Sequence, residues 1–242
     1  MISKEERHSS YTFVTISDIG SNHRALLMPN QDAAAFFCDD EDFILAVSDG
    51  VGSCKKSEIG SDGAVNSCVK VFKKIKNRII AFEDETVAEE LISIWRTSLE
   101  AEDIDDCCTT LKAVIKIGDS IKAISIGDGF IVITSEGIHL LSPSEETSFT
   151  NETKCLSSYV NESDLWISDF HLDTYKPYAI MCCTDGVANG IQPGKEIDLV
   201  EDIEKATSAE ELKAELEELI SDISNYCFDD KTVGVVKYER NN

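Results

Sequence analysis

The stretch FILAVSDGVGS (Phe43 to Ser53) decides the fold, because an apolar run stops abruptly at an aspartate followed by a glycine. A short apolar run bounded by a turn signal is typical of a buried strand. Asp49 and Gly50 both tolerate turn geometry, so the strand is expected to end there. The sequence thus predicts a buried strand that holds the Asp49 carboxylate at its rigid end.

Similar runs lie on both sides of this strand. Between Thr109 and Ser142, four short β-rich runs are separated by glycine-containing turns, which predicts an antiparallel meander. The segment from Ser142 to Pro177 shows little periodicity and is interpreted as an irregular excursion. The expected strands are YTFVTIS (11–17), AAAFFC (33–38), FILAVS (43–48), TTLKAVIKI (109–117), SIKAISI (120–126), GFIVIT (129–134), GIHLLS (137–142), YAIMCCT (178–184) and KTVGVVKY (231–238).

Other segments carry apolar residues at helical spacing. Thr86 is predicted to cap the second of them, with Glu89 three residues on. The order of strands and helices predicts an α+β protein in which antiparallel sheets are covered by helices. No repeat or linker divides residues 1–242, which predicts a single domain. The expected helices are 57–78, 87–102, 197–206 and 208–226.

The composition of the chain indicates which binding partners are unfavourable and in which compartment the protein is expected. The chain has 46 acidic and 22 basic residues, and its net charge of −24 would repel nucleic acids and anionic membranes. No run approaches the roughly 20 apolar residues of a membrane helix, and the start, MISKEERHSS, is mostly polar and charged with no apolar signal-peptide segment behind it, so we expect a cytoplasmic protein. Its nine cysteines are odd in number and show no C-x-x-C spacing, which favours reduced, mostly buried thiols.

Aspartates recur where an apolar β-run meets a loop. They are Asp32 in PNQDA, Asp49 in AVSDGVG, Asp128 in SIGDGF, Asp185 in CCTDGVA and Asp229 in FDDKTVGV. Any one of them is explained by a turn, but the repetition favours a shared site. Strand ends hold side chains at fixed separations, and carboxylate oxygens are the ligands that Mg²⁺ and Mn²⁺ prefer. The aspartates therefore predict a divalent-metal site.

The ordered motifs N-Q-D-A, A-V-S-D-G-V-G-S, T-T, G-D, C-T-D-G-V and D-D-K-T-V resemble those of PP2C-type protein serine/threonine phosphatases across nearly the whole chain. The stretch DGVGSCKKSEIGS is similar to the divergent bacterial branch of that family. The resemblance implies a four-layer αββα sandwich, in which two packed antiparallel sheets are flanked by helices, with a centre of two Mn²⁺ or Mg²⁺ ions in a cleft at one end.

The resemblance also implies roles for individual residues. Asp49 would bridge the two ions, and the Gly50 carbonyl would join their shell. Asp185 and Asp229 would ligate one ion, and Asp32 would act mainly through metal-bound waters. Such a pair of ions lowers the pKa of a shared water and neutralises the phosphoryl oxygens. Asp230 stands where the family usually has asparagine.

The chain departs from the family pattern at its phosphate-binding position. Leu27 stands five residues before Asp32, where family members commonly carry an arginine. Arg24 and His23 are the predicted substitutes, with Lys55 and Lys56 as further candidates. Each of the four also has an ordinary interpretation, as a surface charge or, for His23, as a residue that packs a loop.

A second departure concerns a third, weaker metal site. Many bacterial relatives form it from the G-D aspartate, here Asp128, and an acidic residue four positions after the D-G-V aspartate. That second position is Asn189 in this chain. We therefore expect a third ion to be bound weakly or not at all.

Three functions remain open from the sequence. The first is hydrolysis of phosphoserine and phosphothreonine in a protein substrate, opposing a cognate kinase. The second is a catalytically weak regulatory or binding module, and the third is hydrolysis of a small phosphate ester. Motifs of other catalytic classes are missing: the sequence has no G-x-x-x-x-G-K-[ST], H-E-x-x-H or G-x-S-x-G, and no cysteine lies in an arginine-bearing phosphate loop.

Overall fold

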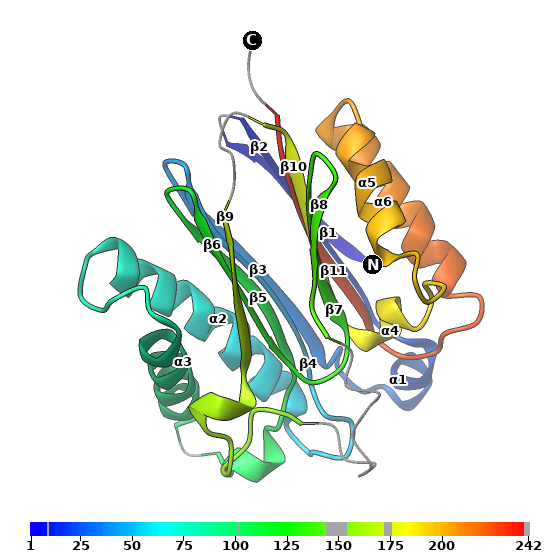
Figure 1. Ribbon diagram of the computed structural model, residues 1–242. Coiled ribbons are helices and arrows are strands. Elements are labelled where there is room, and N and C mark those ends of the chain that lie inside the picture. Colours follow the sequence, from blue (N-terminus) through cyan, green and yellow to red (C-terminus); the bar gives the residue numbers. More distant parts are fainter. Residues whose placement is uncertain (9, 101, 144–153, 172–175, 240–242) are drawn as a thin grey trace.

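Two antiparallel β-sheets lie face to face at the centre of the protein, with helices on both outer faces (Figure 1). The computed structural model describes residues 1–8, 10–100, 102–143, 154–171 and 176–239. The six-stranded sheet has the order β1 (Ile2–His8), β2 (Tyr11–Asp18), β11 (Lys231–Tyr238), β10 (Tyr178–Cys183), β7 (Phe130–Ser135) and β8 (Ile138–Leu141). The five-stranded sheet has the order β3 (Asp32–Asp39), β4 (Asp42–Asp49), β5 (Leu111–Ile117), β6 (Ser120–Ile126) and β9 (Trp166–His171).

Helices complete the four layers. On one side α2 (Ser57–Lys76) and α3 (Asp84–Ser98) cover the five-stranded sheet, and on the other α5 (Glu196–Lys205) and α6 (Ala209–Ile223) cover the six-stranded sheet. The remaining helices are α1 (Ser21–Leu26), α4 (Asp185–Ala188) and the 3₁₀ turns η1 (Ile104–Asp106) and η2 (Glu162–Asp164). The predicted α+β sandwich of two antiparallel sheets is confirmed.

The apolar run in β4 is continuous because both faces of the strand are buried. Phe43, Leu45 and Val47 pack between the two sheets, whereas Ile44 and Ala46 face α2. All five are fully buried. Burying each of the larger side chains contributes about 1.5–3 kcal/mol, so this strand anchors two of the three apolar layers at once.

Several local predictions were wrong. The expected meander is two hairpins in different sheets, because β6 pairs with β9 whereas β7 pairs with β10. Within the segment interpreted as irregular, 166–171 forms strand β9, while 144–153 and 172–175 lie outside the described residues. Thr86 does not cap α3, which begins two residues earlier, after Glu83 in an extended conformation.

Two predictions from composition can be compared with the structure. None of the nine cysteines, all of which lie in the described ranges, forms a disulfide, and five of them are buried. Among the described helices, none has the length and apolar character needed to cross a membrane.

Candidate active site

Asp32 and Asp49 lie directly opposite each other where β3 and β4 meet their loops. The two strands are antiparallel, so the first residue of β3 pairs with the last residue of β4. Alternation along each strand places both carboxylates on the face that packs against the other sheet, since Ala34 and Val47 belong to the core between the sheets. Residues paired in this way have Cβ atoms about 4.5–5.5 Å apart. The strand register alone therefore brings two acidic groups together.

The opposite sheet supplies hydrogen bonds to Asp32. Thr184, which follows β10, donates its hydroxyl to Asp32 Oδ2 over 2.8 Å. The same hydroxyl oxygen accepts the backbone N–H of Thr232 at 3.0 Å, which ties β10 and β11 to the site. Asp32 Oδ1 is buried and makes no hydrogen bond with the described residues. One oxygen is thus held in place, and the other is left for a further partner.

Asp185 enters the site as the first residue of α4, directly after Thr184. The glycine that follows it is required by a close approach, because a Cβ on Gly186 would lie 1.9 Å from the Asp230 carbonyl oxygen. This contact packs α4 against the Asp229–Asp230 segment before β11. Asp229 therefore lies near Asp185, and its charge adds to the raised pKa of both Asp185 and Asp49.

Asp32, Asp49 and Asp185 hold protons more tightly than isolated carboxyl groups do, because they are buried and lie near other acidic groups. Burial raises the pKa of Asp49 to about 10, helped by the charges of Asp32, Asp185 and Asp229. Burial also raises the pKa of Asp32 to about 7, although its hydrogen bonds oppose the shift. Burial followed by the charges of Asp229 and Asp128 raises the pKa of Asp185 to about 6. Added positive charge would therefore stabilise the ionised form of this cluster.

The donor set fits a divalent cation. Every side chain in the cluster offers carboxylate oxygens, the hard donors that Mg²⁺ and Mn²⁺ prefer, and Asp32 Oδ1 is a buried acceptor without a donor among the described residues. In the described part of the chain, no three His, Cys, Asp or Glu side chains are already arranged as ligands around one point. The acidic groups are gathered at one end of the sandwich but are not preset around an ion.

Asp230 has a structural role that the sequence did not reveal. It is 2% exposed, and its carboxylate accepts the N–H of Gly20 at 2.6 Å and the N–H of Gln31 at 2.7 Å. Its Oδ2 also lies 2.9 Å from His23 Nδ1. This one carboxylate ties the start of α1 and the start of β3 to β11. An asparagine has a single oxygen acceptor, so the aspartate accounts for a network in which both oxygens are used.

The sequence matches the family model for protein phosphatase 2C over residues 19–221. The chain belongs to the protein phosphatase 2C family. It matches no curated protein. The match covers every aspartate of the cluster except Asp229, which follows it in the chain.

Solved structures of phosphatases share the fold. RsbX in complex with magnesium has 15% sequence identity and a TM-score of 0.62, over 98% of this chain and 100% of that one. The catalytic domain of the serine/threonine phosphatase PstP, in complex with two manganese ions, has 15% identity and a TM-score of 0.65, over 95% and 99%. The phosphatase domain of SpoIIE from Bacillus subtilis has 18% identity and a TM-score of 0.55, over 98% and 96%. Their likeness confirms the phosphatase 2C sandwich.

The cations expected to replace the family's phosphate-binding arginine are all engaged with acidic groups. Arg24 donates to Asp18 over 2.7 Å, and the His23 ring is held by Asp230. Leu27 caps the end of α1 with a φ of 56° and is 94% exposed. The structure supports loop packing for His23, and the substrate-binding roles of Arg24 and His23 stay predictions. The two lysines pair with Asp106 (Lys55) and Glu102 (Lys56).

A buried lysine near the cluster was missed at the sequence level. Lys112 is 1% exposed, and its ammonium group donates to Ser125 Oγ at 2.8 Å and to the Gly127 carbonyl. It stands on the intersheet face of β5, and its charge partly offsets the raised pKa of Asp185, which burial dominates. The only signal was a lysine inside an apolar strand, TTLKAVIKI, which alternation places between the sheets.

Proposed function

We propose that this phosphatase 2C relative hydrolyses phosphoserine and phosphothreonine in proteins, using two Mn²⁺ or Mg²⁺ ions. The observation that supports this best is the opposed pair Asp32 and Asp49, joined by Asp185, with a buried carboxylate oxygen left without a donor among the described residues. The bound ions would supply an activated water and neutralise the phosphoryl oxygens. The phosphatase structures solved with magnesium or manganese are consistent with such a requirement.

Each residue of the cluster has a proposed task. Asp49, which stands among Asp32, Asp185 and Asp229, would bridge the ions together with the Gly50 carbonyl. Asp185 and Asp229 would hold one of them. Asp32 would act through bound water, since Thr184 fixes one of its oxygens and leaves the other available.

A third ion would be held weakly or not at all. Asp128 lies beside Asp185, close enough for its charge to contribute to the raised pKa of Asp185. Asn189 lines the same pocket and offers a neutral amide where relatives supply a second carboxylate. The proposed third site therefore lacks a charged ligand.

Two other functions stay open. A regulatory module that binds without turnover is favoured by the missing arginine at Leu27 and by the ion pair that occupies Arg24. Hydrolysis of small phosphate esters needs the cluster but no protein-binding surface. The opposing kinase and the cytoplasmic location remain predictions.

One experiment separates the three functions. Hydrolysis of p-nitrophenyl phosphate and of a phosphothreonine peptide is measured with EDTA and with Mn²⁺. We expect Mn²⁺-dependent turnover of both, and a loss of more than a hundredfold in Asp49→Asn, because removing a bridging charge removes activation of the water. Turnover of the aryl phosphate alone would favour a small-ester hydrolase, and binding without turnover would favour a regulatory module.

Asp119→Asn is the matched control. Asp119 also follows a glycine in a turn, but it is exposed and lies between β5 and β6, at the end of the sheet where Asp42 rather than Asp49 stands. The Asp119→Asn variant should hydrolyse both substrates as fast as the parent does. Equal activity of Asp49→Asn and the parent would overturn the proposed role of Asp49.

A further inference from the structure

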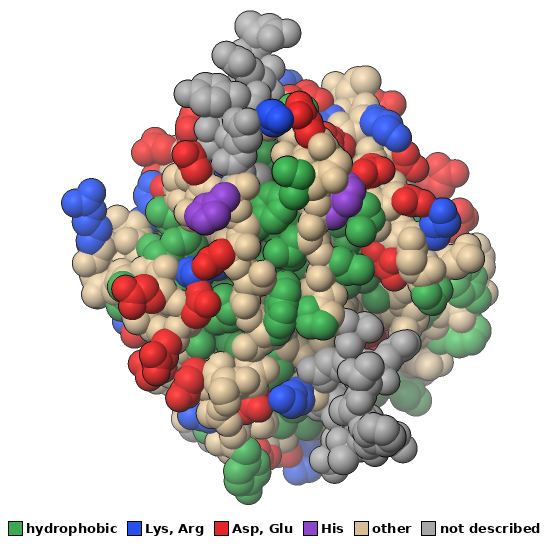
Figure 2. Space-filling model, viewed as in Figure 1, with side chains coloured by type: hydrophobic (Ala, Val, Ile, Leu, Met, Phe, Trp, Pro, Cys, Tyr) green, Lys and Arg blue, Asp and Glu red, His purple; other side chains and the backbone are tan. Residues whose placement is uncertain are grey.

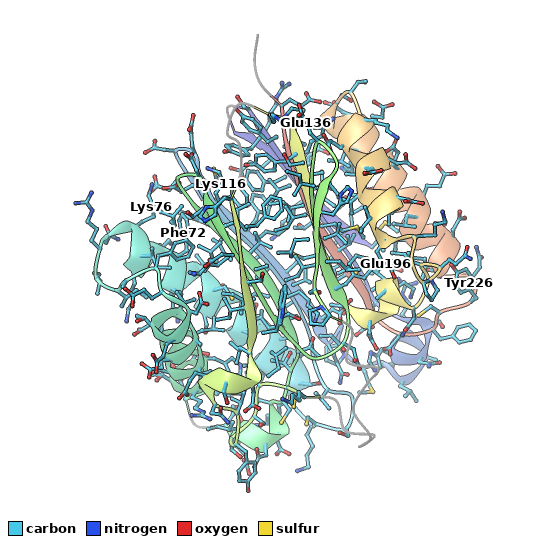
Figure 3. All side chains as sticks on the ribbon, in the orientation of Figure 1. Phe72, Lys76, Lys116, Glu136, Glu196 and Tyr226 are labelled. Carbon is cyan, nitrogen blue, oxygen red and sulfur yellow. The ribbon has the colours of Figure 1, made fainter. Side chains whose placement is uncertain are left out.

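A pocket of about 440 Å³ adjoins the acidic cluster on the side of the six-stranded sheet. Asp185 belongs to both the cluster and the pocket, so a substrate held at the cluster would extend into it. Figure 3 places Glu196 at the end of α5 that lies next to α4. The pocket is lined by Asp128, Gly129, Phe130, Leu141, Ser142, Asp185, Ala188, Asn189, Ile191, Pro193 and Glu196.

The walls of the pocket are largely apolar. Phe130 and Leu141 come from β7 and β8, and Ala188, Ile191 and Pro193 come from α4 and the connection to α5. Such walls suit an aliphatic stem, because lysine and arginine bury their methylene groups against apolar surface while their charged ends reach a polar partner.

The charged lining is entirely acidic. Asp128, Asp185 and Glu196 contribute carboxylates, and none of the described lining residues is Lys, Arg or His. Asp185 and Asp128 lie at the end shared with the proposed metal centre, whereas Glu196 is the charged residue that has no assigned role there. Figure 2 shows acidic side chains over both flanks of the molecule, in line with the net charge of −24. A cationic side chain complements this lining.

Glu196 has the properties of an available ion-pair partner. It is half-buried, and no described residue pairs with its carboxylate or donates a side-chain hydrogen bond to it. The neighbouring Lys195 is engaged by Asp198 at 2.6 Å. A half-buried carboxylate without a counter-charge gains more from a cation than an exposed one, because water screens it less.

A simpler account of Glu196 is favourable interaction with the dipole of α5, in whose first turn it lies. Glu210 offers the matched comparison. It lies in the first turn of α6, is exposed, and does not line the pocket. An effect due to the helix dipole would appear at both residues, whereas an effect of the pocket would appear only at Glu196.

We propose that this pocket binds a lysine or arginine side chain next to the phosphorylated residue, and that Glu196 is its ion-pair partner. The inference rests on the proposed phosphatase function and names its substrate class, a phosphoprotein segment that carries a basic residue beside the phosphoserine or phosphothreonine.

The test uses a set of peptides made of glycine, alanine and one phosphothreonine. In each peptide a single arginine stands one or two positions before, or one or two positions after, the phosphothreonine. Turnover with Mn²⁺ and binding by fluorescence anisotropy are measured for the parent, Glu196→Lys and Glu210→Lys. We expect one arginine position to raise kcat/KM and affinity about fivefold over alanine in the parent, the upper end of the range measured for exposed ion pairs. Glu196→Lys should abolish that preference, and Glu210→Lys should keep it.

Hydrolysis of p-nitrophenyl phosphate separates this inference from the function on which it rests. That substrate carries no basic side chain, so its turnover tests the phosphatase function alone, and the ratio of kcat/KM for the arginine peptide to that for the alanine peptide reports on Glu196. An equal response to arginine and alanine in the parent, or a preference that survives in Glu196→Lys, would overturn the pocket assignment while leaving the phosphatase intact. If the parent hydrolyses neither substrate, the phosphatase function is overturned. Fluorescence anisotropy would still show whether the parent binds the arginine peptide more tightly than the alanine peptide.

Discussion

Metal binding should expel protons from the acidic cluster, because carboxyl groups that are protonated in the metal-free protein must ionise to coordinate a cation. At pH 7 the Asp49 carboxyl, with a pKa of about 10, keeps its proton, and the raised pKa values of Asp32 and Asp185 leave these two groups partly protonated. Release of more than one proton per protein is therefore expected at pH 7. At pH 8.5 only the proton on Asp49 remains, and release should fall to about one.

The assay is isothermal titration calorimetry of Mn²⁺ into the metal-free protein. Titrations at pH 7 in PIPES and in Tris should differ in enthalpy by the number of released protons multiplied by the difference in buffer ionisation enthalpy. Asp119→Asn should release as many protons as the parent. Asp49→Asn should release about one proton fewer than the parent, because it lacks the most strongly held proton.

The titrations of the parent protein test whether the cluster is protonated before metal binds. Equal enthalpies in the two buffers at pH 7 would mean that no proton is released. The carboxylates would then be ionised before any metal arrives, and burial and mutual repulsion would not keep Asp49 protonated at pH 7.

Three further outcomes are expected. In EDTA the melting temperature should fall from pH 5 to pH 8. The carboxyl groups whose pKa is raised above the unfolded value of about 3.9 stabilise the folded state at low pH, and this contribution is lost as the pH rises through their folded pKa values. Saturating Mn²⁺ should remove most of the fall in melting temperature. Arg24→Ala should lower kcat/KM for a phosphopeptide about tenfold, mostly through KM, and Leu27→Arg should raise it; unchanged kinetics in Arg24→Ala would leave Arg24 as a partner of Asp18 alone. Gly186→Ala should lower the free energy of unfolding in urea by about 2 kcal/mol or more, whereas Gly52→Ala, whose added Cβ has its nearest neighbour at 3.8 Å, should change it little.

The sequence predicted the buried strands well because their apolar runs are long and end at clear turn signals. It missed β1, since the charged stretch ISKEERH has no apolar face, as expected of an edge strand. It missed β9 for a related reason, because that strand is an edge whose side chains are mostly half-buried or exposed. The run of hairpins was assigned to one sheet because turn residues report where a strand ends, and not which sheet the next strand joins.

The acidic cluster could be predicted in outline because each aspartate follows or precedes a strand whose register is set by burial. What local sequence could not supply was the set of contacts between distant segments. Asp230 bonds to Gly20 and Gln31, about 200 residues away in the chain, and Thr184 meets Asp32 across the two sheets, 152 residues apart. The predicted role of Arg24 likewise did not take into account its ion pair with Asp18. The direction in which the Asp18 side chain points depends on the alternation of side chains along β2.

The position of β11 has a consequence for how the protein is made. This strand follows every other described strand and helix in the chain, yet it lies between β2 and β10 in the middle of its sheet, and the segment just before it carries Asp229 and Asp230. A nascent chain that has emerged from the ribosome only as far as α6 lacks the central strand of that sheet. It also lacks the Asp230 carboxylate, which joins α1 to β3. The complete acidic cluster, which includes Asp229, can therefore form only after the segment that leads into β11 has been synthesised, and the slow, long-range pairing of β2 with β11 is expected to limit the rate at which competent protein appears.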